Sequence, residues 1–253
     1  MSDRSLRRKT VAARLVQLVP KADWLLDLGG ATGGLSPWLS ANPRPRVVVL
    51  NLDSALLKNA GDSEYPVVGD GCRLPFREGV FHGSTCIDVL EHVPATCRPA
   101  VLSEMKRVTT SHVLLYMPNE DVCRPYERVL YHLSLDRNIR RLVLEHLTVG
   151  PPDLDEIVST FPGCEVSEVR NAYLWLLFMV SSQLPGVGRW VAGPVYRLLF
   201  GLDGQPPFYS RLVEWSATWT TRNRYCEPVH GQTVKRPRDG EHHHRLGTTA
   251  AID

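Results

Sequence analysis

The sequence of 253 residues has little net charge, no paired-cysteine motif and no apolar run that could cross a membrane. A formal charge of +2 is too small to indicate a nucleic-acid partner, which would call for a strongly basic surface. The six cysteines are scattered, so neither a zinc ribbon nor a disulfide framework is predicted, and we expect reduced thiols in a cytoplasmic protein. The apolar run Tyr173–Val180 is much shorter than the roughly 20 residues of a membrane-spanning helix.

Polar segments lie at both ends of the chain. Leu15 and Leu18 belong to a helically spaced apolar pattern, so residues 1–22 are predicted to form a leading amphipathic helix rather than a secretory signal. Residues 220–253 are polar and weakly basic, which predicts a disordered tail. Three adjacent histidines in that tail, His242–His244, are a weak metal signal, and no metal site is predicted.

Strand-like apolar runs recur through the first half of the chain and are mostly separated by helical patterns. The runs are Trp24–Leu28, Val47–Leu52, Tyr65–Val68, Thr85–Val89 and Val113–Met117. Helices are expected to begin at Leu35–Leu39 and to cover Pro99–Val108, where the apolar residues share one face. Strands alternating with helices predict an α/β fold with a doubly wound, mostly parallel sheet and helices on both faces.

The regular alternation stops after the fifth run. Residues 120–150 are predicted to form one or two helices inserted above the sheet, Pro151–Phe161 a further helix, and Cys164–Asn171 a strand. Residues 172–208 are apolar but interrupted by glycine and proline, which favours a helical cap that closes as a lid. A dimer surface and a shallow membrane contact are the alternatives for that segment. Residues 209–219 are expected to form the last strand.

The stretch Trp24–Gly34 is the most informative in the chain. It reads as a buried strand that breaks into a glycine-rich turn, where glycine permits positive φ and lets a ligand lie against backbone amides. Such units hold nucleotide-like cofactors at the carboxyl edge of α/β sheets. Three polar segments follow at the ends of later strands: Asn51-Leu52-Asp53, Asp70-Gly71-Cys72, and Asp88 with Leu90-Glu-His-Val93.

In this order the segments, with Leu74-Pro-Phe76, resemble the class I S-adenosylmethionine-dependent methyltransferases of the large bacterial small-molecule group, over roughly residues 15–170. The resemblance implies a Rossmann-like core over 23–171 with an antiparallel last strand. It also implies that the glycine loop holds the methionine part of the cofactor, that an acid after the second strand binds the ribose, and that Asp70 binds the adenine amine. The expected cofactor-binding residues are Asp27, Gly29, Gly30, Ala31, Gly33, Asn51, Leu52, Asp53, Asp70, Gly71, Cys72 and Asp88.

The ribose-binding position departs from the family pattern. Asn51 stands where the family has a carboxylate, and the nearest acid is Asp53, two residues further on. Because side chains two residues apart share a face of an extended strand, either residue could contact the ribose. Ala31 replaces the middle glycine of the loop, a change that one methyl group should allow.

Methyl transfer needs a base only when the acceptor carries a proton at neutral pH, because the sulfonium methyl is already activated. His92 and His146 are the candidates for that base, and each has a structural role as its alternative. The expected acceptor is a small or lipid-like molecule, methylated on oxygen in the first instance and on nitrogen in the second. The cofactor S-adenosylmethionine yields S-adenosylhomocysteine, with no metal and no nucleic acid, and a homodimer or a peripheral membrane contact remains open.

Two other readings use the same residues. Gly29-x-Ala31-x-x-Gly34 also fits a degenerate dinucleotide fingerprint, which would make the protein an NAD(P)-dependent oxidoreductase. Asp70 and Leu90–Val93 argue against this, because a dehydrogenase does not need that pair. The third reading is a non-catalytic partner that keeps the fold without productive cofactor binding, which Asn51 makes worth retaining.

Overall fold

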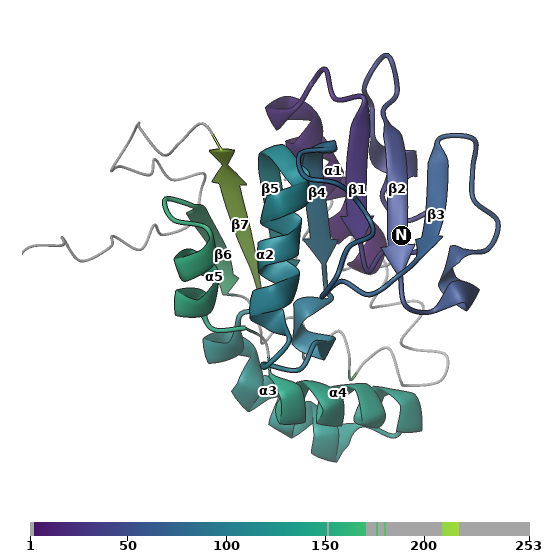
Figure 1. Cartoon of the computed structure of the whole chain (residues 1–253). Helices are drawn as coiled ribbons and strands as arrows, with labels where there is room; N and C mark the ends of the chain where they lie inside the picture. Colours follow the sequence, from purple (N-terminus) through teal and green to yellow (C-terminus); the bar gives the residue numbers. More distant parts are fainter. Residues whose placement is uncertain (1–2, 151, 171–175, 177–179, 181–208, 218–253) are drawn as a thin grey trace, which may run out of the picture.

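A seven-stranded mixed sheet with the order β3-β2-β1-β4-β5-β7-β6 organises the chain (Figure 1). The computed structural model describes residues 3–150, 152–170, 176, 180 and 209–217. The strands are β1 Trp24–Leu28, β2 Arg46–Asn51, β3 Glu64–Val68, β4 Phe81–Ile87, β5 Thr109–Met117, β6 Glu165–Arg170 and β7 Tyr209–Ser216. Strands β1 to β5 pair in parallel, whereas β7 is antiparallel to β5 and β6. The predicted Rossmann-like α/β fold with an antiparallel last strand is confirmed.

The described part of the chain contains five α-helices and three short 3-10 helices; α1 precedes the first strand and the others lie between strands. The α-helices are α1 Asp3–Leu18, α2 Arg98–Val108, α3 Glu120–Leu133, α4 Arg137–Val149 and α5 Leu154–Thr160; the 3-10 helices are η1 Ser36–Trp38, η2 Ser54–Leu57 and η3 Leu90–His92. The helix expected from Leu35 is only the single turn η1. Pro43 and Pro45 follow closely and cannot continue a helix, so the chain returns directly to β2.

Helices cover both faces of the sheet. On one face, Val11 and Leu15 of α1 are fully buried in a cluster with Leu114 of β5. On the other face, α2 and α5 cover the alternate β5 residues Val113 and Leu115. Both faces of β5 are therefore apolar, as expected for a strand in the middle of a doubly wound sheet.

The pair α3–α4 lies below the sheet in Figure 1, at the carboxyl ends of the parallel strands. These are the two helices expected over 120–150. The predicted lid at 172–208 falls outside the described residues except for residues 176 and 180, and the tail at 220–253 lies wholly outside them. Within the described residues, no helix combines the length and hydropathy that a membrane span requires.

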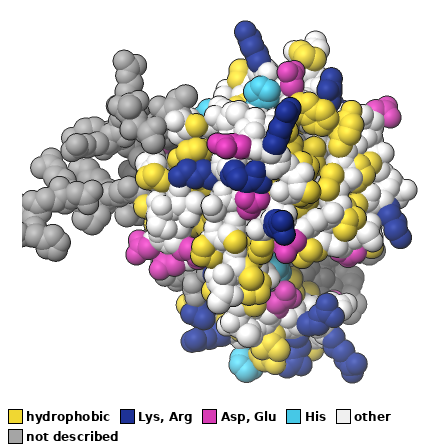
Figure 2. Space-filling model, viewed as in Figure 1, with side chains coloured by type: hydrophobic (Ala, Val, Ile, Leu, Met, Phe, Trp, Pro, Cys, Tyr) yellow, Lys and Arg dark blue, Asp and Glu magenta, His cyan; other side chains and the backbone are white. Residues whose placement is uncertain are grey.

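One surface of the described chain carries exposed apolar side chains at the β3 edge of the sheet. Leu52, Leu56, Tyr65 and Val68 are 73%, 48%, 42% and 61% exposed, and Figure 2 shows apolar groups gathered over β2 and β3. Basic and acidic side chains are interspersed on the face drawn in Figure 2 rather than separated by sign. This apolar edge adjoins the cavity described next, because Leu52 and Leu56 also line it.

Candidate active site

A cavity of about 890 Å³ lies at the carboxyl edge of the parallel strands, between the glycine loop and α4. It is walled by α1, the ends of β1 to β4, η3 and α4. Ten of the residues predicted from the sequence line it: Gly29, Ala31, Asn51, Leu52, Asp70, Gly71, Cys72, Asp88, His92 and His146. Asp27, Gly30, Gly33 and Asp53 are not among the lining residues. The volume is in the range of pockets that enclose a drug-sized ligand.

The glycine loop is held so tightly that three of its glycines have no room for a side chain. A β-carbon on Gly30 would lie 2.1 Å from Oδ2 of Asp27, and one on Gly29 would lie 2.4 Å from Cγ2 of Val89. A β-carbon on Gly34 would lie 2.6 Å from the carbonyl oxygen of Ala31. Gly29 and Gly33 also have φ values of +71° and +70°, which favour glycine. The backbone of the loop is therefore brought against the strand ends and exposed to the cavity at Gly29.

Asp27 supports the loop from beneath. Its side chain is buried, and Oδ1 accepts a hydrogen bond of 3.1 Å from the Thr85 hydroxyl. Burial raises the pKa of Asp27 to about 6, while the Thr85 hydrogen bond and the charge of Arg8 oppose that rise. Asp27 thus packs under Gly30 rather than lining the cavity, and the sequence reading of Asp27 as a cofactor contact stays a prediction.

The side chain of Asn51 is hydrogen-bonded to the glycine loop. Its Nδ2 donates to the carbonyl oxygens of Gly29 at 3.0 Å and Gly30 at 2.8 Å, and its Oδ1 accepts from the Asp53 amide at 2.9 Å. The Asp53 carboxylate is exposed and accepts from the Ala55 amide at 2.8 Å, which caps η2. Asn51 therefore clamps the loop from the end of β2, and the Asp53 carboxylate is engaged in helix capping.

The turn after β3 places Asp70 and Cys72 on the cavity wall. Oδ1 of Asp70 accepts from the Cys72 amide at 2.9 Å, which fixes the orientation of the carboxylate. Desolvation, followed by the hydrogen bond and charge of Asp70, raises the pKa of Cys72 to about 11. The Cys72 thiol is therefore protonated at neutral pH and is not a nucleophile.

An ion pair closes the cavity on the α1 side. Asp88, at the end of β4, has a φ of +53°, and its Oδ1 lies 2.7 Å from Nη1 of Arg7. Both Arg7 and Arg8 line the cavity. The sequence reading did not select these arginines, because nothing in the spacing of a leading helix shows that it passes over the strand ends.

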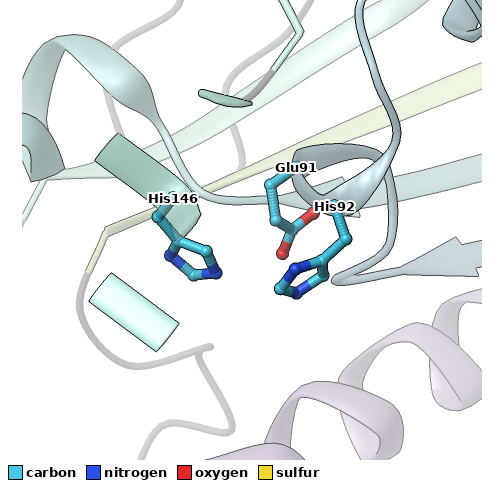
Figure 3. A group of neighbouring side chains, drawn as sticks. All are labelled: Glu91, His92 and His146. Atoms are coloured by element: carbon cyan, nitrogen blue, oxygen red, sulfur yellow. The ribbon is translucent and has the colours of Figure 1, made fainter. Parts of the chain in front are cut away.

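Two histidine–carboxylate pairs meet at the cap end of the cavity. His92 of η3 places Nδ1 3.0 Å from Oε1 of Glu145, and His146 of α4 places Nδ1 3.1 Å from Oε1 of Glu127. The two imidazole centroids are 5.0 Å apart. Figure 3 shows the carboxylate of Glu91 directed toward the two rings. The structure thus brings both predicted catalytic histidines together and adds three carboxylates that the sequence reading did not assign.

Glu91 is the least expected member of this group, because it is 1% exposed. Burial and, after it, the charge of Asp88 raise the pKa of Glu91 well above its ordinary value. Among the described residues, Oε2 of Glu91 and Nε2 of His146 are buried without a hydrogen-bond partner. Such atoms are costly to leave unsatisfied, so this end of the cavity is built for a polar or charged guest.

Arg98 attaches the cap to the sheet. Its guanidinium is 4% exposed and donates to the carbonyls of Leu90 at 3.1 Å and Val93 at 3.0 Å, on either side of His92. It also donates to the carbonyls of Val149 and Gly150, at the end of α4. One buried side chain therefore fixes the position of His146 relative to His92.

Comparison with known proteins gives a family-model match over part of the chain. Residues 26–117 match the family model described as a methyltransferase domain. No curated protein matches the chain. The matched segment runs from β1 to the end of β5 and contains the glycine loop, the Asp70 turn and η3.

Solved structures share the fold at low sequence identity. Phosphoethanolamine N-methyltransferase 2 of Haemonchus contortus, in complex with phosphomonomethylethanolamine and S-adenosylhomocysteine, is 15% identical with a TM-score of 0.52 over 82% of this chain and 52% of that one. The chain thus spans about half the length of the nematode enzyme. Magnesium protoporphyrin IX methyltransferase of Synechocystis PCC 6803, with bound S-adenosylhomocysteine, is 15% identical with a TM-score of 0.51 over 85% and 83% of the two chains. A candidate methyltransferase of an antibiotic biosynthesis pathway of Anabaena variabilis is 13% identical with a TM-score of 0.57 over 85% and 99%.

Proposed function

We propose that this chain is an S-adenosylmethionine-dependent methyltransferase of the class I fold and that its cavity binds the cofactor between the glycine loop and α4. The adenine lies at the end formed by Leu52 and Asp70, where the oriented carboxylate accepts from the exocyclic amine. The methyl group then points to the opposite end, toward His92 and His146. The observation that carries this proposal is the convergence of the predicted residues on one cavity of sufficient volume.

The zwitterionic methionine part finds charges of both signs on the α1 side. Arg7 and Arg8 offer guanidinium groups to its carboxylate, and Asp88 offers a carboxylate to its ammonium. When the cofactor enters, the Arg7–Asp88 ion pair is partly replaced by two new ion pairs, one between Arg7 and the cofactor carboxylate and one between Asp88 and the cofactor ammonium. The exposed backbone at Gly29 supplies neutral hydrogen-bonding groups beside them.

For the ribose, we favour Asn51 as a neutral partner. Its Oδ1 retains a lone pair beside the bond from the Asp53 amide, and the residue lines the cavity, whereas Asp53 does not. Asp53→Ala should therefore leave affinity for S-adenosylhomocysteine within about twofold of wild type. A loss of roughly tenfold or more, measured by calorimetry, would return the ribose to Asp53.

The acceptor is proposed to be a small molecule that loses a proton on methylation, with oxygen as the favoured atom and nitrogen as the alternative. Each histidine at the cap end is oriented by a carboxylate on Nδ1, an arrangement that leaves Nε2 to take a proton. The acceptor gives its proton to one imidazole, and its lone pair forms the new bond to the methyl carbon. The bonding pair of the broken carbon–sulfur bond stays on sulfur, which becomes the neutral thioether of S-adenosylhomocysteine.

The chemical nature of the cavity wall favours an acceptor with an apolar body. Nine leucine, isoleucine and valine side chains line it: Leu28, Leu50, Leu52, Leu56, Ile87, Val89, Val93, Val101 and Leu142. A panel of phenols, long-chain alcohols and amines, each tested with radiolabelled S-adenosylmethionine, tests this part. Transfer to oxygen acceptors that exceeds transfer to matched amines supports the proposal, and turnover of amines alone would move the accepting atom to nitrogen.

The strand order weakens the oxidoreductase reading. A dinucleotide-binding Rossmann sheet continues in parallel as 3-2-1-4-5-6, whereas here β7 is inserted antiparallel between β5 and β6. Residues 172–208 remain our proposal for a lid over the acceptor, with a homodimer surface or a membrane contact as the alternatives.

A further inference from the structure

We propose that Glu91, His92 and His146 form a binding site for one divalent transition-metal ion of the Zn²⁺ type at the acceptor end of the cavity. The inference deepens the proposed function and rests on it for the role of the ion, although the site itself stands on its own geometry. One ring nitrogen of each histidine and one carboxylate oxygen of Glu91 all lie within 4.8 Å of one another. Figure 3 shows the three side chains converging from η3 and α4.

The donor set matches the ion in kind and number. Two imidazoles and one carboxylate are the protein ligands of several catalytic zinc sites, which keep a further position open for water or substrate. All three residues line the cavity, so that open position faces the space where the acceptor binds. Zinc–ligand bonds of roughly 2.0–2.2 Å imply ligand separations near 3.4 Å, so the ion draws the groups together by about an ångström. His92, whose side chain is 34% exposed, has room for this movement.

Carboxylates behind the rings orient both histidines for such an ion. In metal sites the second ring nitrogen donates to a carboxylate or carbonyl, which fixes the tautomer and leaves the other nitrogen to bind the metal. Here Nδ1 of His92 faces Glu145 and Nδ1 of His146 faces Glu127, so Nε2 is the free nitrogen of each ring. The two ring centroids are 5.0 Å apart, and each ring has its own carboxylate on Nδ1. Packing of two rings against each other does not require a carboxylate behind each one, so the arrangement favours a shared ligand.

Orphaned buried atoms are the second line of support. Oε2 of Glu91 and Nε2 of His146 are buried without a hydrogen-bond partner among the described residues. Glu91 is 1% exposed and has Asp88 and Glu127 as further acidic neighbours, with Arg7 as the opposing charge. A divalent cation satisfies both orphaned atoms at once and compensates the accumulated negative charge.

The ion would change how the acceptor is activated. With both imidazoles bound to the metal, neither takes the acceptor proton, and the cation instead lowers the pKa of an acceptor hydroxyl that fills its open position. The proton leaves to solvent, the oxygen lone pair bonds to the methyl carbon, and the carbon–sulfur pair passes to sulfur. This role favours an oxygen acceptor, because a hydroxyl is the group that a zinc ion acidifies.

Metal binding is tested directly on the full-length chain, with His242, His243 and His244 replaced by alanine so that the tail adds no competing ligands. Zn²⁺ is titrated in competition with a chromophoric chelator, and metal content is counted after dialysis. We expect one ion per chain, with affinity reduced by more than roughly 100-fold in Glu91→Gln and in His146→Ala. Glu145→Gln should lose about 10- to 100-fold, as orienting carboxylates do.

The matched control is His132→Ala, which removes an exposed histidine of the neighbouring helix α3 without touching the cluster. Each variant is also titrated with S-adenosylhomocysteine, so that retained cofactor binding proves folding. Co²⁺ serves as the spectroscopic probe, because a thiolate charge-transfer band would assign the metal to a cysteine, such as Cys72 or Cys97 in the same cavity, instead of the cluster.

The outcomes separate the two proposals. Stoichiometric Zn²⁺ binding that is lost in the cluster variants and kept in His132→Ala supports the site, whether or not the cofactor binds. Equal Zn²⁺ affinity in all variants, a thiolate spectrum, or no binding by a chain that still binds S-adenosylhomocysteine overturns it and leaves the methyltransferase assignment intact. Absence of cofactor binding in the unmodified chain would instead count against the proposed function alone.

Discussion

Replacing Asn51 tests whether this residue holds the glycine loop in shape. Asn51→Ala removes two bonds donated to the carbonyls of Gly29 and Gly30 and one accepted from the Asp53 amide. A net hydrogen bond contributes about 0.5–1.5 kcal/mol. Asn51 is half-buried, so water replaces part of what is lost, and we expect the free energy of unfolding to fall by about 2–3 kcal/mol. In a domain of this size that corresponds to a drop in Tm of roughly 5–10 °C.

The substitution Asn51→Asp, which places a carboxylate at this position, is the sharper variant. A carboxylate keeps the bond from the Asp53 amide but cannot donate, and it sets a negative charge against the two carbonyl oxygens that Nδ2 now binds. We expect Asn51→Asp to be at least as unstable at pH 8 as Asn51→Ala. Part of that loss should be recovered near pH 4, because the native environment raises the pKa of the new carboxyl group.

Thermal unfolding and calorimetry with S-adenosylhomocysteine measure both effects. We expect affinity for the ligand to fall by about 10- to 100-fold in Asn51→Ala, because the variant must spend binding free energy on ordering the loop. Each factor of ten in affinity corresponds to about 1.4 kcal/mol of that free energy. Asp53→Ala is the control, because it removes an exposed cap without touching the loop carbonyls. An Asn51→Asp protein with wild-type Tm and tighter ligand binding would refute the clamp and show that a carboxylate here reaches the ribose.

Three further predictions concern the same framework. Gly30→Ala should abolish binding of S-adenosylhomocysteine, because the new β-carbon would lie 2.1 Å from Oδ2 of Asp27. The β-carbon of Gly33→Ala meets nothing within 4 Å. Gly33→Ala should therefore lower the free energy of unfolding, measured with denaturant, by only about 1–2 kcal/mol of backbone strain. Asp27 has a pKa of about 6 in the folded protein against an ordinary 3.8, so the native state holds a proton that the unfolded state has lost, and the free energy of unfolding falls as pH rises from about 4 to 6. Asp27→Asn should flatten that fall. At pH 8 it should raise the free energy of unfolding by up to about 3 kcal/mol, measured in urea titrations. Arg98→Met should lower the free energy of unfolding by about 3–5 kcal/mol, because it leaves buried carbonyl groups without their donor. Hydrogen exchange that is faster in α4 than in β4 would show that the cap has detached from the sheet. Equal exchange in the two elements would contradict the anchoring role of Arg98.

Much of the fold follows from the sequence, because the strands are buried apolar runs ended by glycine or polar residues. The carboxyl ends of parallel strands meet at one edge, so Gly29, Asp70 and Asp88 could be placed in one cavity from their positions alone. The bounds of β4 were less accessible. The strand starts at Phe81 and includes His82 and Gly83, which do not belong to an apolar run.

The parts that the sequence did not reveal depend on contacts between distant segments. Arg7 meets Asp88 across 81 positions, and no motif links a leading helix to the end of β4. The partners of the histidines were equally hidden, because the placing of Glu127 behind His146 depends on how α3 packs on α4. For the ribose, the sequence offers Asn51 and Asp53 as alternatives, because spacing shows which face of a strand a side chain lies on but not that the Asn51 amide is already bonded to the glycine loop.

Calorimetric titration of the full-length chain with S-adenosylhomocysteine and, separately, with NAD⁺ tests the central claim most directly. The account predicts one site per chain for S-adenosylhomocysteine, weakened in Gly30→Ala, and no comparable affinity for NAD⁺. Tight binding of NAD⁺ with no binding of the sulfur nucleotide would contradict it.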